Sequence, residues 1–350
     1  MRAPITHVLG ARPNFMKAAP VIRALGALGH TQRIVHTGQH YDERMSEVFF
    51  VQLSLPRPDV NLGVGSGSHA TQTAEVLTGM EREFTENSPA LAVVYGDVNS
   101  TIGAALAGAK LGVPMAHVEA GLRSFDPAMP EERNRIAVDQ MAALLLCPDE
   151  HSAAQLESEG VRGRREVVGD VMRDALDLFV PIADRLAQQR QQPYALLTIH
   201  RASNTEPDRL RRLISELNGT GWTFVFPVHP RTRHVLDENG IRLSPDIEAI
   251  DPQGYLELLA LLRGATRVVT DSGGMQKEAY WLGIPCVTLR KGTEWVDTVA
   301  SGANTLVDPD DPSSLGYVLT HAEFPADAPQ LYGDGHASER IATALYANQP

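Results

Sequence analysis

The chain has 350 residues, about twice the ~100–200 residues usual for one domain, so we expect two domains, each large enough to bury its own core. Hydrophobic residues make up 43% and charged residues 21%, an ordinary globular composition, and no apolar run approaches the ~20 residues of a membrane-spanning helix. A formal net charge of −12 argues against non-specific nucleic-acid binding, which needs an electropositive face. We therefore expect no membrane and no nucleic-acid partner.

The N-terminus and the cysteines bear on the compartment. Residues 1–10 contain a strand-like segment, THVLG, and lack the basic region and long apolar stretch of a signal peptide, so translocation is not expected. Cys147 and Cys286 both lie inside apolar, strand-like segments, which favours two buried thiols over a disulfide. The sequence thus predicts a protein of the reducing cytoplasm.

The first half of the chain alternates short apolar runs with helical patterns. The apolar runs are ITHVLG, RIVHTG, ALAVVYG, PMAHVE, LLLCP and EVVG, and the helical patterns include FMKAAPVIRALGALG and STIGAALAGAKLG. Strands separated by helices of this length predict parallel βαβ units. Residues 1–169 are therefore predicted to form an α/β domain with a Rossmann-like, doubly wound parallel sheet.

A domain boundary is predicted near Gly169–Asp170, where a helical pattern leads into a polar, Gln-rich connection. A second series of apolar runs then follows: YALLTIH, TFVFPVH, DIEAID, RVVTD and PCVTLR. Residues 170–337 are therefore predicted to form a second Rossmann-like domain. The last helical pattern, residues 338–348, is expected to cross back and pack on the first domain.

Polar residues follow several of the predicted strands. Because an open parallel sheet binds ligands at the carboxyl ends of its strands, these positions indicate a ligand cleft. The positions are Arg12 and Lys17 after the first strand, then Asp97, Glu119, His200, His229 and Asp271 after later ones.

The segment TDSGGMQKE lies between a predicted strand and a helix. Gly273 and Gly274 allow a tight turn and leave helix N-terminal amides directed at an anion, so a diphosphate fits this site. The alternative is an ordinary glycine turn with Ser272 as the N-cap. Glu278 is either an acceptor for ribose hydroxyls or a solvated helix charge. The spacing matches neither GxGxxG nor GxxxxGK[ST].

The segment MPEERNRIAVDQMAALLL predicts a helix entered at Pro130, with Glu131 and Arg135 one turn apart. Taken alone, this spacing indicates a routine i,i+4 ion pair. Glu119 and Arg123 precede it across a Gly/Pro-containing loop, which favours several carboxylates and guanidiniums on one wall of the cleft. Such groups suit general acid–base catalysis on a sugar.

His200 and His229 end apolar strands, and Arg201 and Arg231 stand beside them. One such histidine would more often be structural, but two at equivalent strand ends favour a role as phosphate partners. A zinc site is disfavoured because HExxH and CxxC are missing, and we expect no catalytic metal. A serine hydrolase is disfavoured because GxSxG is missing.

Several long segments occur in one order over residues 5–308: GARPNFMKAAPVI, TGQHYDERMSEVFF, VVYGDVNSTIGAALAGAKLGVPMAHVEAGLRSFDPAMPEERNR, GDVMRDA, LLTIHRASN, FPVHPRT and VVTDSGGMQKEAYWLGIPCVTLRKGTEWVDTVASGANTLV. Together they resemble the non-hydrolysing UDP-N-acetylglucosamine 2-epimerases. The resemblance implies a GT-B-like fold whose two Rossmann-like domains close over a UDP-sugar. It also implies a homodimer that serves bacterial cell-surface polysaccharide synthesis.

The resemblance also implies roles for three sets of residues. The catalytic set is Asp97, Glu119, Glu131 and His200, with Arg135 in support. The UDP-sugar-binding set is Arg12, Lys17, His229, Ser272, Gly273, Gly274, Glu278 and Arg290. A third set matches positions implicated in activation by a second UDP-N-acetylglucosamine: Gln39, Gln72 and Arg201.

The implied reaction inverts the second carbon of the sugar in UDP-N-acetylglucosamine and gives UDP-N-acetylmannosamine. In the family route UDP is eliminated to leave a 2-acetamidoglucal and is then added back, with the proton delivered to the opposite face. No redox cofactor is needed. Cations and helix amides would stabilise the departing diphosphate, and carboxylates would exchange the proton.

Four departures from the family pattern leave the substrate open. Lys277 stands where an acidic residue is common, Gln140 stands where histidine is common, and Asn14 stands where glutamate is common. The segment 293–297, which contains Trp295, often reads TERPE in the family. One alternative is a 2-epimerase of a related UDP-sugar, such as UDP-2,3-diacetamido-2,3-dideoxy-glucuronic acid. The others are a GT-B glycosyltransferase, a hydrolysing epimerase and a non-catalytic UDP-sugar sensor.

Overall fold

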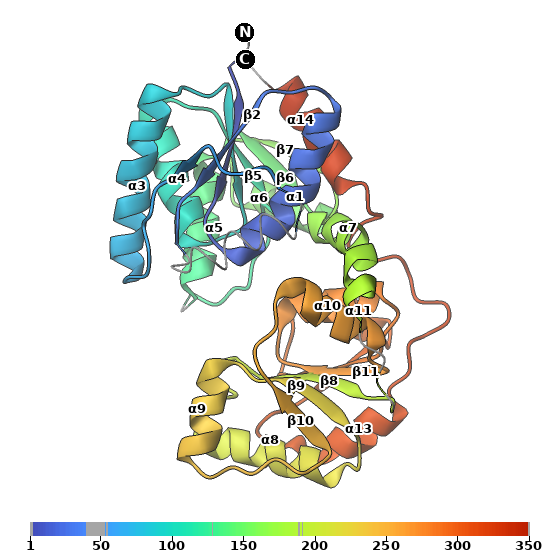
Figure 1. The fold of residues 1–350 in the computed structure, drawn as a ribbon. Helices are drawn as coiled ribbons and strands as arrows, with labels where there is room; N and C mark the ends of the chain where they lie inside the picture. The colour runs from blue at the N-terminus through green and yellow to red at the C-terminus, as the bar shows by residue number, and fades with distance from the viewer. Residues whose placement is uncertain are drawn as a thin grey trace. The chain divides into compact units, whose positions relative to one another are not determined.

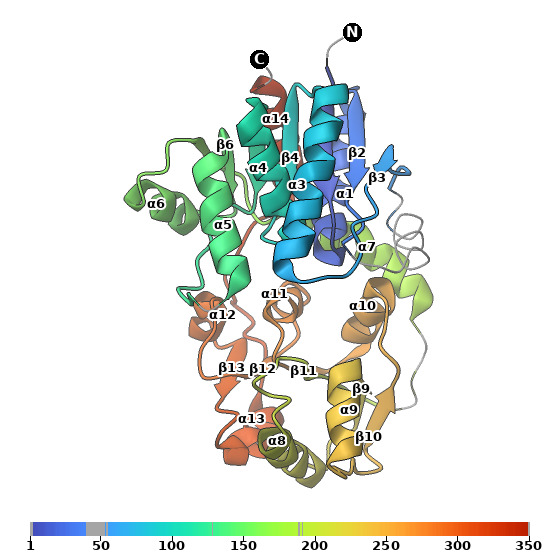
Figure 2. The same cartoon turned by 90° about the vertical axis from the view of Figure 1, so that its left-hand side faces the viewer.

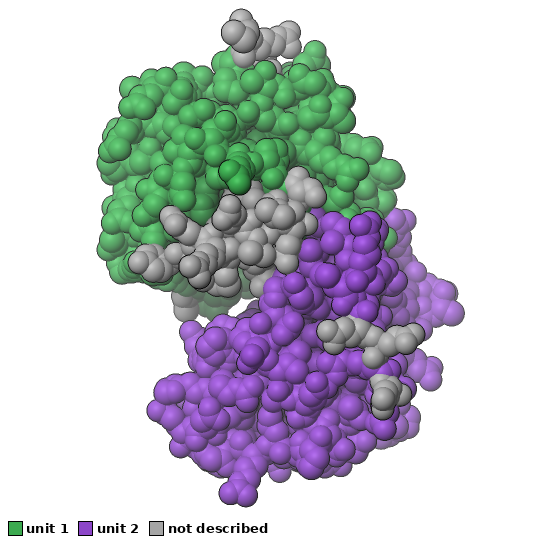
Figure 3. Space-filling model, in the orientation of Figure 1, with its two compact units in different colours: residues 1–178, 332–350 green, residues 179–331 purple. Residues whose placement is uncertain are grey.

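The computed structural model describes residues 3–39, 53, 55–127, 129–187, 190 and 192–348, except for the side chain of Arg12. The chain divides into two compact units (Figure 3). Unit 1 comprises residues 1–178 and 332–350, and unit 2 comprises residues 179–331. Each unit has its own sheet and its own core.

Unit 1 contains a parallel sheet of seven strands in the described part of the chain, in the order β3-β2-β1-β4-β5-β6-β7. Strands β1, β4, β5 and β6 are buried along their whole length, because helices cover both faces of the sheet. Helices α3, α4 and α5 lie on one face, and α1 and α14 on the other (Figures 1 and 2). The strands are β1 Ile5–Leu9, β2 Gln32–His36, β3 Val60–Asn61, β4 Leu91–Tyr95, β5 Met115–Val118, β6 Leu144–Cys147 and β7 Arg164–Val167. The helices are α1 Arg12–Ala27, α3 His69–Glu86, α4 Asn99–Leu111, α5 Pro130–Met141, α6 Glu150–Ser158, α7 Val171–Leu186 and α14 Ala337–Ala347.

Unit 2 repeats this architecture with a parallel sheet of six strands in the described residues, in the order β10-β9-β8-β11-β12-β13. Its core packs helices against the inward side chains of β8, β9, β11 and β12. The strands are β8 Ala195–Thr198, β9 Phe224–Pro227, β10 Ile247–Ile250, β11 Arg267–Thr270, β12 Cys286–Leu289 and β13 Asn304–Val307. The helices are α8 Pro207–Gly219, α9 Pro230–Glu238, α10 Tyr255–Gly264, α11 Gly273–Trp281, α12 Val296–Ala300 and α13 Leu315–His321, with a 3-10 turn at Pro312–Ser314. The predicted pair of doubly wound α/β sheets is confirmed.

The strand order reverses once in each sheet, between β1 and β4 in unit 1 and between β8 and β11 in unit 2. Connections leave the two strands of such a pair toward opposite faces, which exposes the turns at their carboxyl ends. These two points are therefore where each unit is expected to present ligand-binding groups.

The division between the units differs from the boundary expected at Gly169–Asp170. It lies inside α7, between Leu178 and Phe179, and the chain returns to unit 1 between Leu331 and Tyr332. The Gly169–Asp170 turn lies at the start of α7, and this helix runs on to Leu186 without a break. The C-terminal helix α14 packs on α1, as expected for residues 338–348.

Both cysteines are free and buried, as predicted. Burial raises the pKa of each thiol to about 12, so neither is a reactive thiolate at neutral pH. None of the helices in the described ranges is long and apolar enough to cross a membrane.

The buried Asp174 of α7 holds the first turn of α14, and its loss should weaken the fold. Its carboxylate accepts hydrogen bonds from the backbone N–H groups of Ala337 (3.1 Å) and Ser338 (2.7 Å) and from the Ser338 hydroxyl (2.6 Å). Asp174→Ala should therefore lower the free energy of unfolding by about 1–3 kcal/mol. Asp177→Ala is the control, because Asp177 forms only a half-exposed pair with Arg173 on the same helix. Equal urea midpoints for the two variants would contradict the anchoring role.

Candidate functional site

Asn14 ties together the ends of β1 and β4 in unit 1. Its Oδ1 accepts the backbone N–H groups of Gly10 (3.2 Å) and Ala11 (3.0 Å), and its Nδ2 donates to the carbonyl of Tyr95 (2.7 Å). Gly10 is required here, because a Cβ atom would lie 1.8 Å from Ser100 Oγ. The turns after β1 and β4 are thus held in register at the point where the strand order reverses.

Glu119 and Lys17 form an ion pair next to these turns. Glu119 follows β5 with a left-handed φ of 72°, a strained conformation for a residue with a side chain. A Cβ at Gly96 would lie 3.0 Å from Lys17 Nζ and 3.3 Å from Glu119 Oε2, so glycine leaves room for the pair. Burial opposes the charge of Lys17, but Glu119 and Asp97 outweigh it and hold the pKa of the ammonium above its ordinary value.

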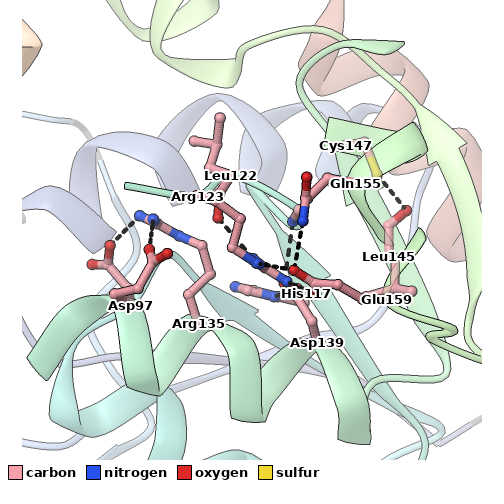
Figure 4. Close-up of polar contacts among 12 residues, drawn as sticks. Asp97, His117, Leu122, Arg123, Arg135, Asp139, Leu145, Cys147, Gln155 and Glu159 are labelled. Atoms are coloured by element: carbon pink, nitrogen blue, oxygen red, sulfur yellow. Dashed lines mark hydrogen bonds and ion pairs between the residues drawn. The ribbon is translucent and has the colours of Figure 1, made fainter. Parts of the chain in front are cut away.

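Asp97 pairs with Arg135, which extends from α5 (Figure 4). Asn134 Nδ2 also donates to the backbone carbonyl of Asp97 (2.9 Å), so α5 holds both the side chain and the backbone carbonyl of Asp97. The i,i+4 pair expected between Glu131 and Arg135 is not found in the described part of the chain. Arg135 instead reaches Asp97 and, at 3.7 Å, Glu132, because α5 is turned so that Arg135 faces the turn after β4.

Arg123 does not line a cleft wall as expected. Its side chain is 2% exposed and pairs with Asp139 (2.8 Å) and Glu159 (2.6 Å) (Figure 4). Burial opposes the charge of Arg123, but the hydrogen bonds that it donates to Glu159 and Asp139 hold its pKa above the ordinary value. The loop after β5 therefore turns this guanidinium inward, where it has a structural role.

In unit 2, Asp271 organises the turn after β8. It is fully buried and accepts the backbone N–H groups of His200 (3.0 Å) and Arg201 (3.0 Å) and the side-chain amide of Asn204 (3.2 Å). Its other oxygen lies 3.1 Å from Nδ1 of His200. Burial acts to raise the pKa of Asp271, but the hydrogen bonds from His200 and the backbone outweigh it and hold the pKa below its ordinary value.

His200 and His229 lie close together, as their positions after β8 and β9 predict. Their ring centroids are 6.3 Å apart. Nδ1 of His229 accepts the N–H of Arg231 (3.2 Å), so Nε2 carries the proton of the neutral ring. Burial and then the nearby His200 lower the pKa of His229, which keeps the ring neutral and able to donate to a ligand.

The N-terminus of α11 carries Ser272, Gly273 and Gly274. Ser272 is the N-cap residue, as the alternative reading expected, but its side chain makes no capping hydrogen bond. The backbone amides of this helix end lie at the turn after β11, next to the strand-order reversal. Glu278, one turn further, is buried and accepts a hydrogen bond from Tyr255 Oη (3.1 Å). The alternative that Glu278 is a solvated helix charge is therefore wrong.

Two arginines of unit 2 place positive charge near this helix end. Burial and then the charge of Arg290 lower the pKa of Arg201, which shows that the two guanidiniums repel each other. Arg201 donates to the carbonyl of Asp271 (2.9 Å), and Arg290 pairs with Glu294 (2.8 Å). A bound anion would relieve this repulsion, so these cations suit a phosphate group.

Lys277 and Trp295 are in contact. The Lys277 ammonium lies 4.0 Å from the ring centroid of Trp295 and 5.5 Å from that of Trp281. A cation over an indole face is stabilised by the ring quadrupole. Two of the departures from the family pattern are therefore one coupled feature of this unit.

The three residues of the expected second site fall into different units. In unit 1, Gln39 Oε1 accepts hydrogen bonds from the hydroxyl (2.6 Å) and the N–H (3.0 Å) of Ser100. Gln72 Nε2 donates to the carbonyl of Gly65 (2.8 Å), and its Oε1 accepts from Asn99 (2.8 Å). These contacts bring Gln39 and Gln72 into one polar cluster of unit 1, whereas Arg201 belongs to unit 2.

Of the other predicted residues, the side chain of Arg12 lies outside the described part of the structure. Glu131 is half-buried in the first turn of α5. No three His, Cys, Asp or Glu side chains among the described residues form a metal-binding group. Sequence reasoning missed the supporting roles of His117, Asp139 and Asn14. The only sequence signal for the first two was a polar residue at a position that should be buried.

Asp271→Asn should destabilise the protein at neutral pH, because the new amide group would face donors that now meet a carboxylate oxygen. We expect a loss of about 1–3 kcal/mol in the free energy of unfolding. The carboxylate contributes fully above its unfolded-state pKa near 3.8 and loses its contribution as the pH falls through the lower folded value. Chemical unfolding at pH 7 and near pH 3 should therefore show the deficit shrinking in acid. The exposed Asp237→Asn is the control, and a deficit independent of pH would refute this account.

Comparison with known proteins places this site in a family. A family model described as UDP-N-acetylglucosamine 2-epimerase matches residues 24–346. The chain is 43% identical to the UDP-2,3-diacetamido-2,3-dideoxy-D-glucuronate 2-epimerase of Pseudomonas aeruginosa, with 97% of this chain and 99% of that relative covered. Its structure is similar to a crystal structure of Methanocaldococcus jannaschii UDP-GlcNAc 2-epimerase in complex with UDP-GlcNAc and UDP, with a TM-score of 0.87 and 36% identity over 99% and 100% of the two chains.

The fold also occurs in a protein of another activity. A calicheamicin glycosyltransferase is similar with a TM-score of 0.53 and 15% identity over 99% and 95% of the two chains, which shows the GT-B-like fold alone. The family model, by contrast, spans nearly the whole chain and includes the ends of β4, β5, β8 and β11. The chain therefore belongs to the UDP-N-acetylglucosamine 2-epimerase family, as its motifs predicted.

Proposed function

We propose that the protein interconverts UDP-N-acetylglucosamine and UDP-N-acetylmannosamine by inverting the second carbon of the sugar. Family membership over residues 24–346 is the observation that carries this proposal. Unit 1 would act on the sugar, and unit 2 would bind the UDP part.

The chemistry must remove a proton that is barely acidic, since no carbonyl is attached to the second carbon. Elimination solves this problem: the C1–O bond to UDP breaks, the second carbon gives up its proton, and a 2-acetamidoglucal remains. Re-addition of UDP to the first carbon, with a proton delivered to the opposite face of the second, gives the epimer. UDP and the proton are both returned, so the reaction consumes no co-reactant.

Asp97 and Glu119 are the proposed proton-transfer groups, supported by Glu131 and His200. Both carboxylates follow neighbouring strands, and each is held by a cation, Arg135 for Asp97 and Lys17 for Glu119. A paired carboxylate remains ionised and positioned, which suits a general base. In the course of elimination, the same cations would stabilise negative charge that gathers on the departing diphosphate.

The UDP part would be held by unit 2. The amides of Ser272, Gly273 and Gly274 at the start of α11 suit a phosphate, and Arg201 and Arg290 supply charge nearby. We propose that Glu278 accepts the ribose hydroxyls and that the Nε2–H of His229 donates to the UDP. Arg12 and Lys17 are proposed diphosphate partners from unit 1.

The decisive experiment is an incubation with UDP-N-acetylglucosamine in deuterated water without added metal or nicotinamide. We expect UDP-N-acetylmannosamine that carries deuterium at the second carbon, because re-addition takes its proton from solvent. Proton NMR reads both the epimer and the isotope. Free N-acetylmannosamine would indicate a hydrolysing epimerase, and an unchanged sugar transferred to an acceptor would indicate a glycosyltransferase.

Asp97→Asn and Glu119→Gln should each lower kcat by about 10²–10⁴-fold, the usual contribution of a general acid–base group. UDP binding, measured by calorimetry, should be retained, because the proposed UDP-binding residues of unit 2 are untouched. Asp126→Asn serves as the control, since Asp126 is an exposed residue of the loop before α5. An intact kcat in both variants would show that Asp97 and Glu119 do not transfer the proton. A UDP-sugar sensor would instead bind UDP without any turnover in the unmodified protein.

A second candidate keeps the reaction and changes the sugar to UDP-2,3-diacetamido-2,3-dideoxy-glucuronic acid. The observation that favours it is the 43% identity to the Pseudomonas aeruginosa enzyme, against 36% for the Methanocaldococcus jannaschii structure. The two substrates differ at the third and sixth sugar positions. Comparison of kcat/KM for both UDP-sugars on the same preparation decides between them.

We also propose that the enzyme is a homodimer that acts in the cytoplasm, in bacterial cell-surface polysaccharide synthesis. A second UDP-N-acetylglucosamine is proposed to activate it through Gln39, Gln72 and Arg201. Light scattering coupled to size-exclusion chromatography measures the mass of the assembly against the 38.0 kDa chain. Rates that rise more steeply than hyperbolically with substrate would support the activation.

A further inference from the structure

We propose that His117 is a buried imidazolium, held by Asp139, and that it positions the turn carrying Asp97 for the epimerase reaction. The positioning role rests on the proposed function, whereas the charge on His117 does not. His117 lies in β5, and Asp139 lies in α5. Both side chains are fully buried.

The hydrogen-bond partners of His117 decide its charge. Nδ1 lies 2.7 Å from Asp139 Oδ1 (Figure 4). Nε2 lies 2.8 Å from the backbone carbonyl of Gly96. A carbonyl oxygen can only accept, and so can an ionised carboxylate. Both ring nitrogens must then donate, which requires the doubly protonated ring unless the proton lies on Asp139.

The surroundings of Asp139 place the proton on the histidine. Asp139 Oδ2 lies 2.8 Å from the guanidinium of Arg123 and accepts the N–H of Gly121 (3.3 Å). Burial would raise the pKa of Asp139, but the hydrogen bond with His117 and the charge and hydrogen bond of Arg123 outweigh it, and the pKa lies below its ordinary value. Three donors on one carboxylate favour the anion.

The other charges around this pair form a balanced network. Glu159 at the C-cap of α6 neutralises the second side of Arg123 (Figure 4). At the strand ends, Arg135 pairs with Asp97, and Lys17 pairs with Glu119. The Asp139 anion therefore lies between two cations, Arg123 and the proposed imidazolium. Arg123 also forms an ion pair with Glu159.

His117 and Asp139 contact the turns that carry the two proposed proton-transfer groups, Asp97 and Glu119. The carbonyl of Gly96 belongs to the peptide that joins Gly96 to Asp97, and Gly96 has a left-handed φ of 62°. His117 thus fixes the orientation of that peptide from β5. Through Gly121, Asp139 also holds the turn that follows the strained Glu119. A neutral ring would leave either Asp139 or the Gly96 carbonyl without its donor.

A second buried histidine of the same sheet provides a contrast. His7 in β1 faces Tyr95 Oη (2.7 Å) from Nδ1 and Gln32 Oε1 (3.0 Å) from Nε2. The tyrosine hydroxyl can donate, so the neutral ring satisfies both contacts. Burial lowers the pKa of His7 to about 4, although the hydrogen bond that it donates to Gln32 acts in the opposite direction. His7 is therefore the matched control for a buried, neutral strand histidine.

The charge can be measured directly by NMR of the ring nitrogens in protein labelled with ¹⁵N-histidine. At neutral pH we expect two protonated ring nitrogens for His117 and one unprotonated nitrogen for His7. His117→Gln and His7→Gln assign the signals by their disappearance. An unprotonated nitrogen on His117 in the unmodified protein would overturn the imidazolium, and this result needs no variant that folds.

The positioning role is measured by kinetics on UDP-N-acetylglucosamine. His117→Gln and Asp139→Asn should each lower kcat by about 10²-fold, the cost of a misplaced catalytic group, with little change in KM and with UDP binding retained. Asp139→Asn should also convert His117 to the neutral form in the ¹⁵N spectrum. His7→Gln should keep its kcat. A normal kcat in folded His117→Gln would overturn the positioning role.

The two proposals can fail separately. If the unmodified enzyme does not epimerise any UDP-sugar, the proposed function and the positioning role both fall. The ¹⁵N signals would still establish or overturn the buried imidazolium in that case. Active enzyme with a neutral His117 would overturn only the inference made here about this pair.

Discussion

In each unit, one buried carboxylate holds a turn that follows a strand. Asp139 in unit 1 and Asp271 in unit 2 are fully buried, and each accepts hydrogen bonds from a histidine and from backbone N–H groups of a turn after a strand. An ionised carboxylate in such a place is stable only while those donors stay in position, so the turn and the charge stabilise each other. In this way each unit fixes the backbone on which its proposed site residues stand.

The same constraint explains the strain at Glu119. A non-glycine residue with φ of 72° costs free energy that the surrounding contacts must offset. Two contacts offset this free energy. One is the ion pair between Glu119 and Lys17, and the other is the hydrogen bond from the N–H of Gly121 to Asp139. With this strained backbone conformation, the carboxylate of Glu119 meets the ammonium of Lys17.

Much of the fold could be predicted from the sequence, because periodic apolar runs and helix patterns are local signals. Both parallel sheets followed from that alternation, and the strand-end rule found Asp97, Glu119, His200 and Asp271. The side chains that pair could not be predicted, because pairing depends on how helices are rotated against the sheet. Arg135 therefore reaches Asp97 across the unit rather than Glu131 one turn away, and Arg123 points inward to Asp139.

Lys277 and Trp295 show why departures from a family pattern need a structure before they are counted. In the sequence they are two separate departures from the family pattern, which together with Gln140 and Asn14 leave the substrate open. In unit 2 the ammonium lies 4.0 Å from the indole centroid, so the two departures form one contact. One coupled exchange is weaker support for a new substrate than two independent ones. The choice between the two UDP-sugars therefore depends on the groups that touch the third and sixth sugar positions.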